Sequence, residues 1–310
     1  MAAKTAPVEG RNRLFAAVST TRTKRLLFIW GGLTPIMVYF LVFSVLPIIA
    51  SFYISLHDWP LMSRARPFIG LGNYLDVIGD TRFWISLKNT AYYAVAFMVL
   101  VIVLGLALAL LTNSLSSGAR SIIRPLYFAP QVTSAVAVAL MFAWLYQPQW
   151  GVLNYLLKFL GLGPYLWLKS SSQVMPAIII TGVWQALGYS MVIYTAGLVN
   201  IPTDLKEAGA VDGASPWKVF LHIVMPLLQP TTLFMFVTSM ISGLQVFTEV
   251  WLMSGGGPGT ASRVLVLEIY EQGFRYFEMG RASSIAFYLF FLIAVIAYLQ
   301  MRFLRERFEF

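Results

Sequence analysis

The sequence predicts an all-α integral membrane protein built as a six-helix transmembrane bundle. Of its 310 residues, 58% are hydrophobic and only 11% are charged, whereas soluble domains carry about 25% charged residues. The apolar residues fall into six separate runs, each with the roughly 20 residues that a helix needs to cross the hydrocarbon core. One membrane domain is therefore expected in place of two soluble ones.

The predicted spans leave a short tail at each end of the chain. The first apolar run is longer than the core of a signal peptide, so it is expected to be retained as a span. The membrane domain covers residues 26–304, between a cytoplasmic N-terminal tail at 1–25 and a cytoplasmic C-terminal tail at 305–310. The spans are expected at 27–52, 90–111, 122–146, 174–201, 227–253 and 282–303.

Charge sets the expected orientation in the cell membrane. The positive-inside rule places the basic N-terminal tail in the cytoplasm, and six spans then return the C-terminus to the same side. The net charge of +9 is spread over tails and short loops, so no nucleic-acid partner is expected. The basic residues of the N-terminal tail, against the single acid Glu9, are Lys4, Arg11, Arg13, Arg22, Lys24 and Arg25.

Three segments carry local signals of their own. The outer loop at 57–89 is punctuated by proline and glycine, which favours a packed segment over one long helix. Pro125 and Pro130 lie in the third span, where missing backbone donors are expected to bend the helix. The loop at 254–280 opens with a glycine-rich run and continues into 264–277, where a short helix is expected.

The polar segment at 202–226 predicts two short helices joined at a glycine. Thr203 and Asp204 offer a cap and an acid for the first helix. Gly213 can take the left-handed conformation that ends this helix, and Ser215 with Pro216 can begin a second one that stops before Pro226. An amphipathic hairpin resting on lipid headgroups is the simplest alternative.

The same segment resembles the EAA loop of permeases from importers of the ATP-binding cassette (ABC) superfamily. That pattern is Glu-Ala-Ala, three residues, Gly, nine residues, Ile, one residue and Leu-Pro. Gly209 and Met225 replace an alanine and the leucine of the pattern. The resemblance implies a type I ABC importer permease whose loop forms a coupling helix against an ATPase. The residues assigned to ATPase coupling are Glu207, Ala208, Gly209, Asp212, Gly213, Ala214, Ile223 and Pro226.

Further segments resemble carbohydrate permeases of the maltose and glycerol-phosphate type. They are 68–74, 129–130 with Trp144 and 151–154, and 255–258 with 269–270 and Phe274. The resemblance implies a second permease subunit in a heterodimer, two ATP-binding subunits and an extracellular or periplasmic solute-binding protein. It implies a sugar or oligosaccharide as solute, with glycerol phosphate or another polar solute as the alternative.

Polar side chains inside spans are costly and usually face the bundle interior or a water-filled path. Thr238, Ser242, Gln245 and Glu249 share one face if the fifth span is a single helix. Amides and hydroxyls can bind sugar hydroxyls, and aromatic rings can lie against a pyranose. The alternative is ordinary hydrogen bonding between helices and an aromatic belt at the interface. The candidate substrate path comprises Gln131, Ser134, Trp184, Gln185, Tyr189, Ser242, Gln245 and Glu249.

Enzymatic chemistry has no motif in this sequence. It contains no cysteine and two histidines, and it lacks the glycine-rich lysine motif that binds nucleotide phosphates. We therefore expect no catalytic residue, metal or cofactor on this chain, with ATP and Mg²⁺ on the partner ATPase. A self-sufficient secondary transporter or channel would need inverted repeats or charges within the spans, and a membrane enzyme would need a convergent catalytic set.

Overall fold

The computed structural model describes the backbone of residues 9–305 and the side chains of residues 23–302. Over this range the chain is helical and forms no β-strand, only two isolated bridges, His57 with Phe68 and Pro60 with Glu278. It divides into two units, Met1–Ile54 and Ser55–Phe310, which are described separately. The predicted all-α class is confirmed.

The first unit is one long apolar helix. It consists of α1 (Glu9–Phe40), a π-helical turn (Leu41–Val45) and α2 (Leu46–Ser55), which ends at the first residue of the second unit. The stretch Thr23–Ser55 has a mean hydropathy of 2.3, and none of its most apolar window is buried. The helix begins at Glu9, within the predicted N-terminal tail; residues 1–8 and the predicted C-terminal tail beyond Arg305 lie outside the described residues.

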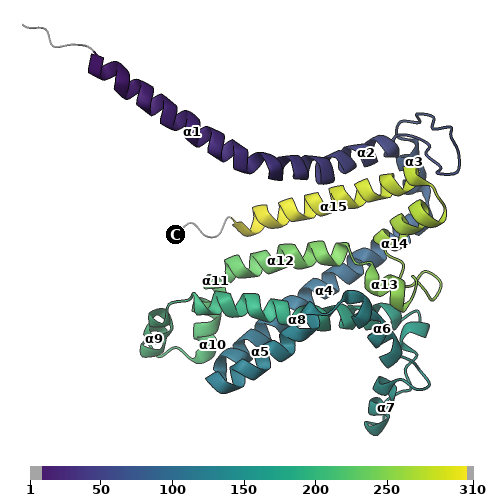
Figure 1. Cartoon of the computed structure of the whole chain (residues 1–310). Coiled ribbons are helices and arrows are strands. Elements are labelled where there is room, and N and C mark those ends of the chain that lie inside the picture. Colours follow the sequence, from purple (N-terminus) through teal and green to yellow (C-terminus); the bar gives the residue numbers. More distant parts are fainter. Residues whose placement is uncertain (1–8, 306–310) are drawn as a thin grey trace, which may run out of the picture. The chain divides into compact units, whose positions relative to one another are not determined.

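The second unit holds the remaining helices (Figure 1). Three of them, α4, α8 and α15, are each long and apolar enough to cross a membrane. Two bent pairs of helices, α5 with α6 and α10–α11 with α12, are also long and apolar enough when each pair is counted as one span. Together with the helix of the first unit, this gives up to six spans over the described residues. The bounds are α3 (Gly72–Gly79), α4 (Thr81–Ser114), α5 (Ser117–Val132), α6 (Ala135–Leu145), α7 (Val152–Phe159), α8 (Val174–Val199), α9 (Thr203–Val211), α10 (Pro216–Val219), α11 (Met225–Leu227), α12 (Gln229–Leu244), α13 (Thr248–Met253), α14 (Leu265–Tyr270) and α15 (Met279–Arg305).

The third span bends by 98° between α5 and α6. The break lies at Thr133 and Ser134, three residues beyond Pro130, so both prolines remain inside α5. The carbonyl of Thr133 accepts a hydrogen bond of 3.1 Å from the side-chain amide of Gln185 on α8. This bond compensates a backbone acceptor that the interrupted helix leaves without an intrahelical partner.

The largest errors in the predicted boundaries are in the second and fifth spans. The second span begins at Thr81 instead of residue 90, because the Asp80 carboxylate caps α4 by accepting from the Arg82 amide at 2.8 Å. The fifth span does not continue from 227 to 253. It stops at Leu244, where the Gln245 amide donates to the carbonyls of Ile241, Ser242 and Gly243 and the backbone leaves the helical region. The next helix, α13, begins only at Thr248.

The core of the second unit forms where α4, α8 and α12 pack together. Small residues allow close approach: Gly243 of α12 lies against the backbone of Ala94 on α4. Ser190 of α8 faces Gly105 and donates a hydrogen bond of 2.9 Å to the Val101 carbonyl. Such contacts are typical of helix packing inside membranes.

Replacing Gly243 by alanine is expected to lower the stability of the protein by about 1–3 kcal/mol. A Cβ at this position would lie 2.7 Å from the Cα of Ala94, and backbone cannot rotate away as a side chain can. Thermal unfolding of the purified protein in detergent measures the effect. Gly118→Ala is the matched control, because nothing lies within 4 Å of its Cβ position; equal losses in both variants would contradict the explanation.

The loop at 57–80 is packed, as the sequence predicts. Asn73 of α3 donates hydrogen bonds to the carbonyls of Ser55 and His57 at 2.9 and 2.8 Å. Asp80 pairs with Arg281 at the start of α15. The loop is thereby tied both to the preceding helix end and to the last span.

Candidate functional site

The loop after α8 forms the helix, glycine turn and helix that the sequence predicts. Gly213 has φ +77°, the left-handed conformation that follows the end of α9. The Ala214 amide donates to the Gly209 carbonyl at 3.0 Å and the Gly213 amide to the Ala210 carbonyl at 3.1 Å. These two bonds define a Schellman motif, which satisfies carbonyls at a helix C-terminus.

The second helix begins as expected and ends later. The Ser215 hydroxyl caps it by accepting from the Lys218 amide at 3.4 Å, with Pro216 at the first position. The helix does not stop before Pro226. A π-helical turn at Phe220–Val224 lets it continue through Pro226 to Leu227, where it bends by 65° into α12.

The start of the first helix also differs from the prediction. Thr203 is the first residue of α9, and Pro202 occupies the capping position without a side-chain hydrogen bond. The Thr203 hydroxyl instead lies 3.5 Å from the Asp204 carboxylate. No hydroxyl therefore caps this helix.

The residues assigned to coupling divide between an exposed face and a packed face. Glu207, Ala208 and Asp212 are exposed, and Ala214 and Ile223 are half-buried. Gly209 is buried, and a Cβ built there would lie 2.8 Å from Cδ1 of Ile223. The glycine in place of the expected alanine thus lets α9 pack closely on the second helix. The exposed face is free to contact a partner.

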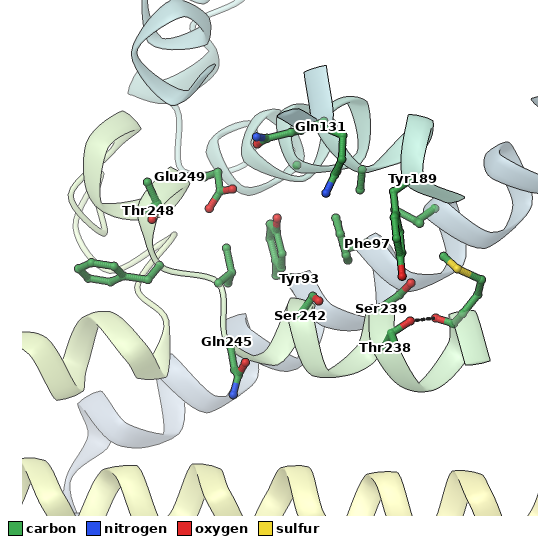
Figure 2. A pocket seen from close by; sticks show the side chains of 17 residues that line it. Tyr93, Phe97, Gln131, Tyr189, Thr238, Ser239, Ser242, Gln245, Thr248 and Glu249 are labelled. Carbon is green, nitrogen blue, oxygen red and sulfur yellow. Dashed lines mark hydrogen bonds between the residues drawn. The ribbon is translucent and has the colours of Figure 1, made fainter. Parts of the chain in front are cut away.

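A cavity of about 500 Å³ lies between α4, α5, α8 and α12. Figure 2 shows Gln131 and Glu249 on one side and Ser242, Ser239 and Thr238 of α12 on the other, with Tyr93 and Phe97 between them. The rings of Tyr93 and Phe97 stack with centroids 5.7 Å apart. Hydroxyls, amides and one carboxylate therefore surround a space that also offers aromatic faces.

Six of the eight predicted path residues line this cavity. Ser134 and Trp184 do not: Ser134 lies just beyond the bend at the start of α6, and Trp184 packs edge-on against Phe142 at 5.2 Å. The side-chain amide of Gln245 points away from the α12 hydroxyls (Figure 2). The lining residues that were predicted are Gln131, Gln185, Tyr189, Ser242, Gln245 and Glu249.

Several lining residues were missed. Tyr93 and Phe97 lie in a strongly apolar helix, whose most apolar window has a mean hydropathy of 3.1. In such a segment an aromatic residue carries no signal that distinguishes a cavity from a core. Ser239 and Thr248 were missed because, in a continuous fifth span, they would not lie on the helix face that carries Ser242 and Glu249. Thr238, which the sequence places on one face with Ser242, lines the cavity, as does Phe247.

The glycine-rich loop after α13 is pinned by its neighbours. The Ser262 hydroxyl donates to the Gly257 carbonyl at 2.6 Å and lies 2.8 Å from the Ser254 hydroxyl. Asn89 of α4 donates to the carbonyls of Thr260 and Arg263 at 2.9 and 3.0 Å. The predicted helix follows as α14 and a π-helical turn, Glu271–Arg275.

A charged cluster closes this loop. Arg263 donates to Glu268 at 2.5 Å and also pairs with Glu271, and all three side chains are largely buried. Burial lowers the pKa of the Arg263 guanidinium, but its hydrogen bonds with Glu268 and Glu271 and their negative charges outweigh burial and raise the pKa above its usual value. Arg275 adds an exposed partner to Glu271 at 2.8 Å.

A multi-span helical protein with a polar cavity among its spans and a structured helical loop at one end has the features of a membrane permease. Over the described residues, no group of three or more His, Asp or Glu side chains is placed to hold a metal ion. The family described as "Binding-protein-dependent transport system inner membrane component" matches residues 101–309. The chain belongs to this family.

Curated relatives extend the similarity over most of the chain. The probable ABC transporter permease protein PH1215 of Pyrococcus horikoshii is 36% identical over 286 residues, which cover 90% of this chain and 96% of the relative. The trehalose/maltose transport system permease protein MalF of Thermococcus litoralis is 33% identical over 276 residues, 88% of this chain and 92% of the relative.

The fold is shared with a solved transporter. A chain from the crystal structure of a bacterial ABC transporter that imports the acidic polysaccharide alginate matches with a TM-score of 0.81 and 24% identity. The match covers 96% of this chain and all of the other. The protein is therefore a multi-pass membrane permease with the fold of an ABC importer subunit.

Proposed function

We propose that this chain is the permease subunit of an ABC importer that carries a sugar or oligosaccharide. The observation that supports this most directly is the cavity, where hydroxyls and amides from α5, α8 and α12 face the rings of Tyr93, Phe97 and Tyr189. These groups match the alternating hydroxyl and apolar surfaces of a sugar. Relatives are named for arabinooligosaccharide and lactose transport, respectively AraP of Bacillus subtilis and LacF of Rhizobium radiobacter.

The lining favours a neutral solute over glycerol phosphate. Among the described residues that line the cavity there is no Lys or Arg, and the one charged side chain is the carboxylate of Glu249. A phosphate would enter such a site without a cationic partner, at a large cost in desolvation. A neutral polyol needs only hydrogen bonds.

The loop at 202–226 is proposed to couple transport to ATP. Its exposed Glu207 and Asp212 would meet basic groups of an ATPase that holds ATP and Mg²⁺, while the packing of Gly209 on Ile223 transmits movement into α12. This assignment puts the loop and both termini in the cytoplasm. The full importer would contain a second permease, two ATPase subunits and an external solute-binding protein.

Reconstitution tests the proposal. The chain in proteoliposomes with its cognate second permease, ATPase and solute-binding protein should take up sugar only when ATP is inside and the binding protein is outside. Substrate should also stimulate ATP hydrolysis. Uptake by this chain alone without ATP would instead indicate a secondary transporter or channel and would refute the proposal.

Replacing Gln131 by leucine is expected to reduce sugar uptake about five- to tenfold. The Gln131 side chain lines the cavity, and the change removes one hydrogen-bonding group, worth roughly 1–1.5 kcal/mol. Initial uptake rates over a range of loaded binding protein measure the effect. Gln149→Leu makes the same chemical change in an exposed loop outside this cavity; an equal loss in that control would remove Gln131 from the path.

A further inference from the structure

A second cavity lies between α5 and α8, at the end where α8 leads into the loop at 202–226. Its volume is about 370 Å³, and it is lined by Arg124 together with Thr195, Asn200 and the apolar residues Met191, Val192, Ala196 and Val199. It shares no lining residue with the larger cavity. Its position beside the end of α8 separates it from the proposed sugar path.

Arg124 differs from the other arginines whose contacts the structure defines. Its Nε is buried and has no hydrogen-bond partner, and no ion pair involves Arg124 over the described residues. Arg120, one turn earlier on the same face of α5, donates to the Leu115 carbonyl at 2.7 Å. Arg263, Arg275 and Arg281 are each paired with a carboxylate. Over the described residues, the charge of Arg124 therefore has no carboxylate partner.

Arg124 lies near the start of α5, the first part of the bent candidate span formed by α5 and α6. It lies seven residues beyond Ser117, the first residue of α5, which is about 10 Å at 1.5 Å per residue. A long cationic side chain at this depth reaches toward lipid phosphates when no protein acid is near. The Asn200 amide lines the same cavity and supplies a second donor.

The surface around the cavity is apolar. Two apolar residues of α8 that line it, Val192 and Val199, are 40% and 70% exposed. A phosphate held by Arg124 would thus carry its acyl chains along an apolar helix surface. A protein partner would more typically bring a polar rim to such a contact.

We propose that this cavity binds the headgroup of an anionic phospholipid, with Arg124 and Asn200 donating to its phosphate. The lipid would sit against the last turn of α8, directly before the coupling loop. Only the choice of leaflet rests on the proposed function: a cytoplasmic coupling loop places the cavity in the leaflet whose surface is enriched in anionic lipid.

Native mass spectrometry of the full chain in nonionic detergent tests the proposal by titration with single lipids. Phosphatidylglycerol is expected to bind more tightly than phosphatidylcholine. Arg124→Gln should weaken phosphatidylglycerol binding about five- to tenfold and leave phosphatidylcholine binding unchanged, whereas Arg124→Lys should retain most of the preference. Lys158→Gln removes the same charge from the exposed helix α7 and should have no effect.

Three results would overturn the assignment. One is an unchanged phosphatidylglycerol affinity in Arg124→Gln. Another is inorganic phosphate displacing the lipid at equal concentration, which would indicate a site for free anions. The third is loss of the second permease subunit from the Arg124→Gln complex with lipid binding intact, which would indicate a protein contact. A melting temperature measured for each variant separates these results from unfolding, and none of them bears on sugar uptake.

Discussion

Replacing Arg263 by methionine is expected to destabilise the protein by about 3–5 kcal/mol. The side chains of Glu268 and Glu271 are 2% and 6% exposed, so removal of the guanidinium leaves two buried carboxylates without their main partner. The amide of Gln272 still donates to Glu268 at 2.8 Å, but it carries no charge. Thermal unfolding in detergent should show a melting temperature several degrees lower.

The exposed member of the same cluster provides the control. The Arg275 side chain is 62% exposed and pairs with Oε1 of Glu271, so Arg275→Gln should cost no more than about 1 kcal/mol. Limited proteolysis between residues 254 and 264 offers a second measurement, because the Arg263 cluster holds this loop closed. Equal shifts for the two variants would show that burial does not set the energetics of the cluster.

The spans could be predicted because hydropathy and length depend only on local composition. The turn at Gly213 could also be predicted, since only glycine adopts φ +77° without strain and the neighbouring Ser215 and Pro216 are strong helix-start signals. The extension of that helix through Pro226 could not be predicted. A proline tolerates the first turn of a helix, and the π-helical turn before it gives Pro226 such a position.

The two helix breaks affect the assignments to one helix face differently. Gln131 and Ser134 are three residues apart and would share a face in a continuous helix, but the 98° bend between them sends Ser134 away from the cavity. Glu249 lines the cavity although its predicted helix ends at Leu244. No proline or charge marks that second break, where Val246 within it and Val250 just after it are buried by tertiary packing.

The alternative that polar residues in the spans make ordinary hydrogen bonds between helices holds in part. The amide of Gln185 serves the backbone by donating to Thr133 at the bend, as expected of interhelical bonding. The same side chain lines the cavity. A variant at this position would therefore confound helix geometry with solute contact, which makes Gln131 the better probe.

Replacing Gly213 by valine is expected to reduce substrate-stimulated ATP hydrolysis by about tenfold or more in the reconstituted importer. A β-branched residue at φ +77° is strained by roughly 1–2 kcal/mol. Relief of that strain would break the bonds from Gly213 to Ala210 and from Ala214 to Gly209, which fix the angle between α9 and the following helix. The face carrying Glu207 would then no longer be presented to the ATPase in one orientation.

A second glycine in the same loop distinguishes turn geometry from general sensitivity. Gly209→Ala introduces a Cβ near the end of the Ile223 side chain, which can rotate, and it restores the alanine of the EAA pattern at a helical position. Alanine also favours the helix by about 1 kcal/mol, so stimulation should stay within about twofold of the parent. If Gly213→Val keeps full stimulation while remaining folded, the loop does not couple through its turn. If Gly209→Ala loses stimulation as well, close packing on Ile223, more than the turn, sets the geometry that the ATPase requires.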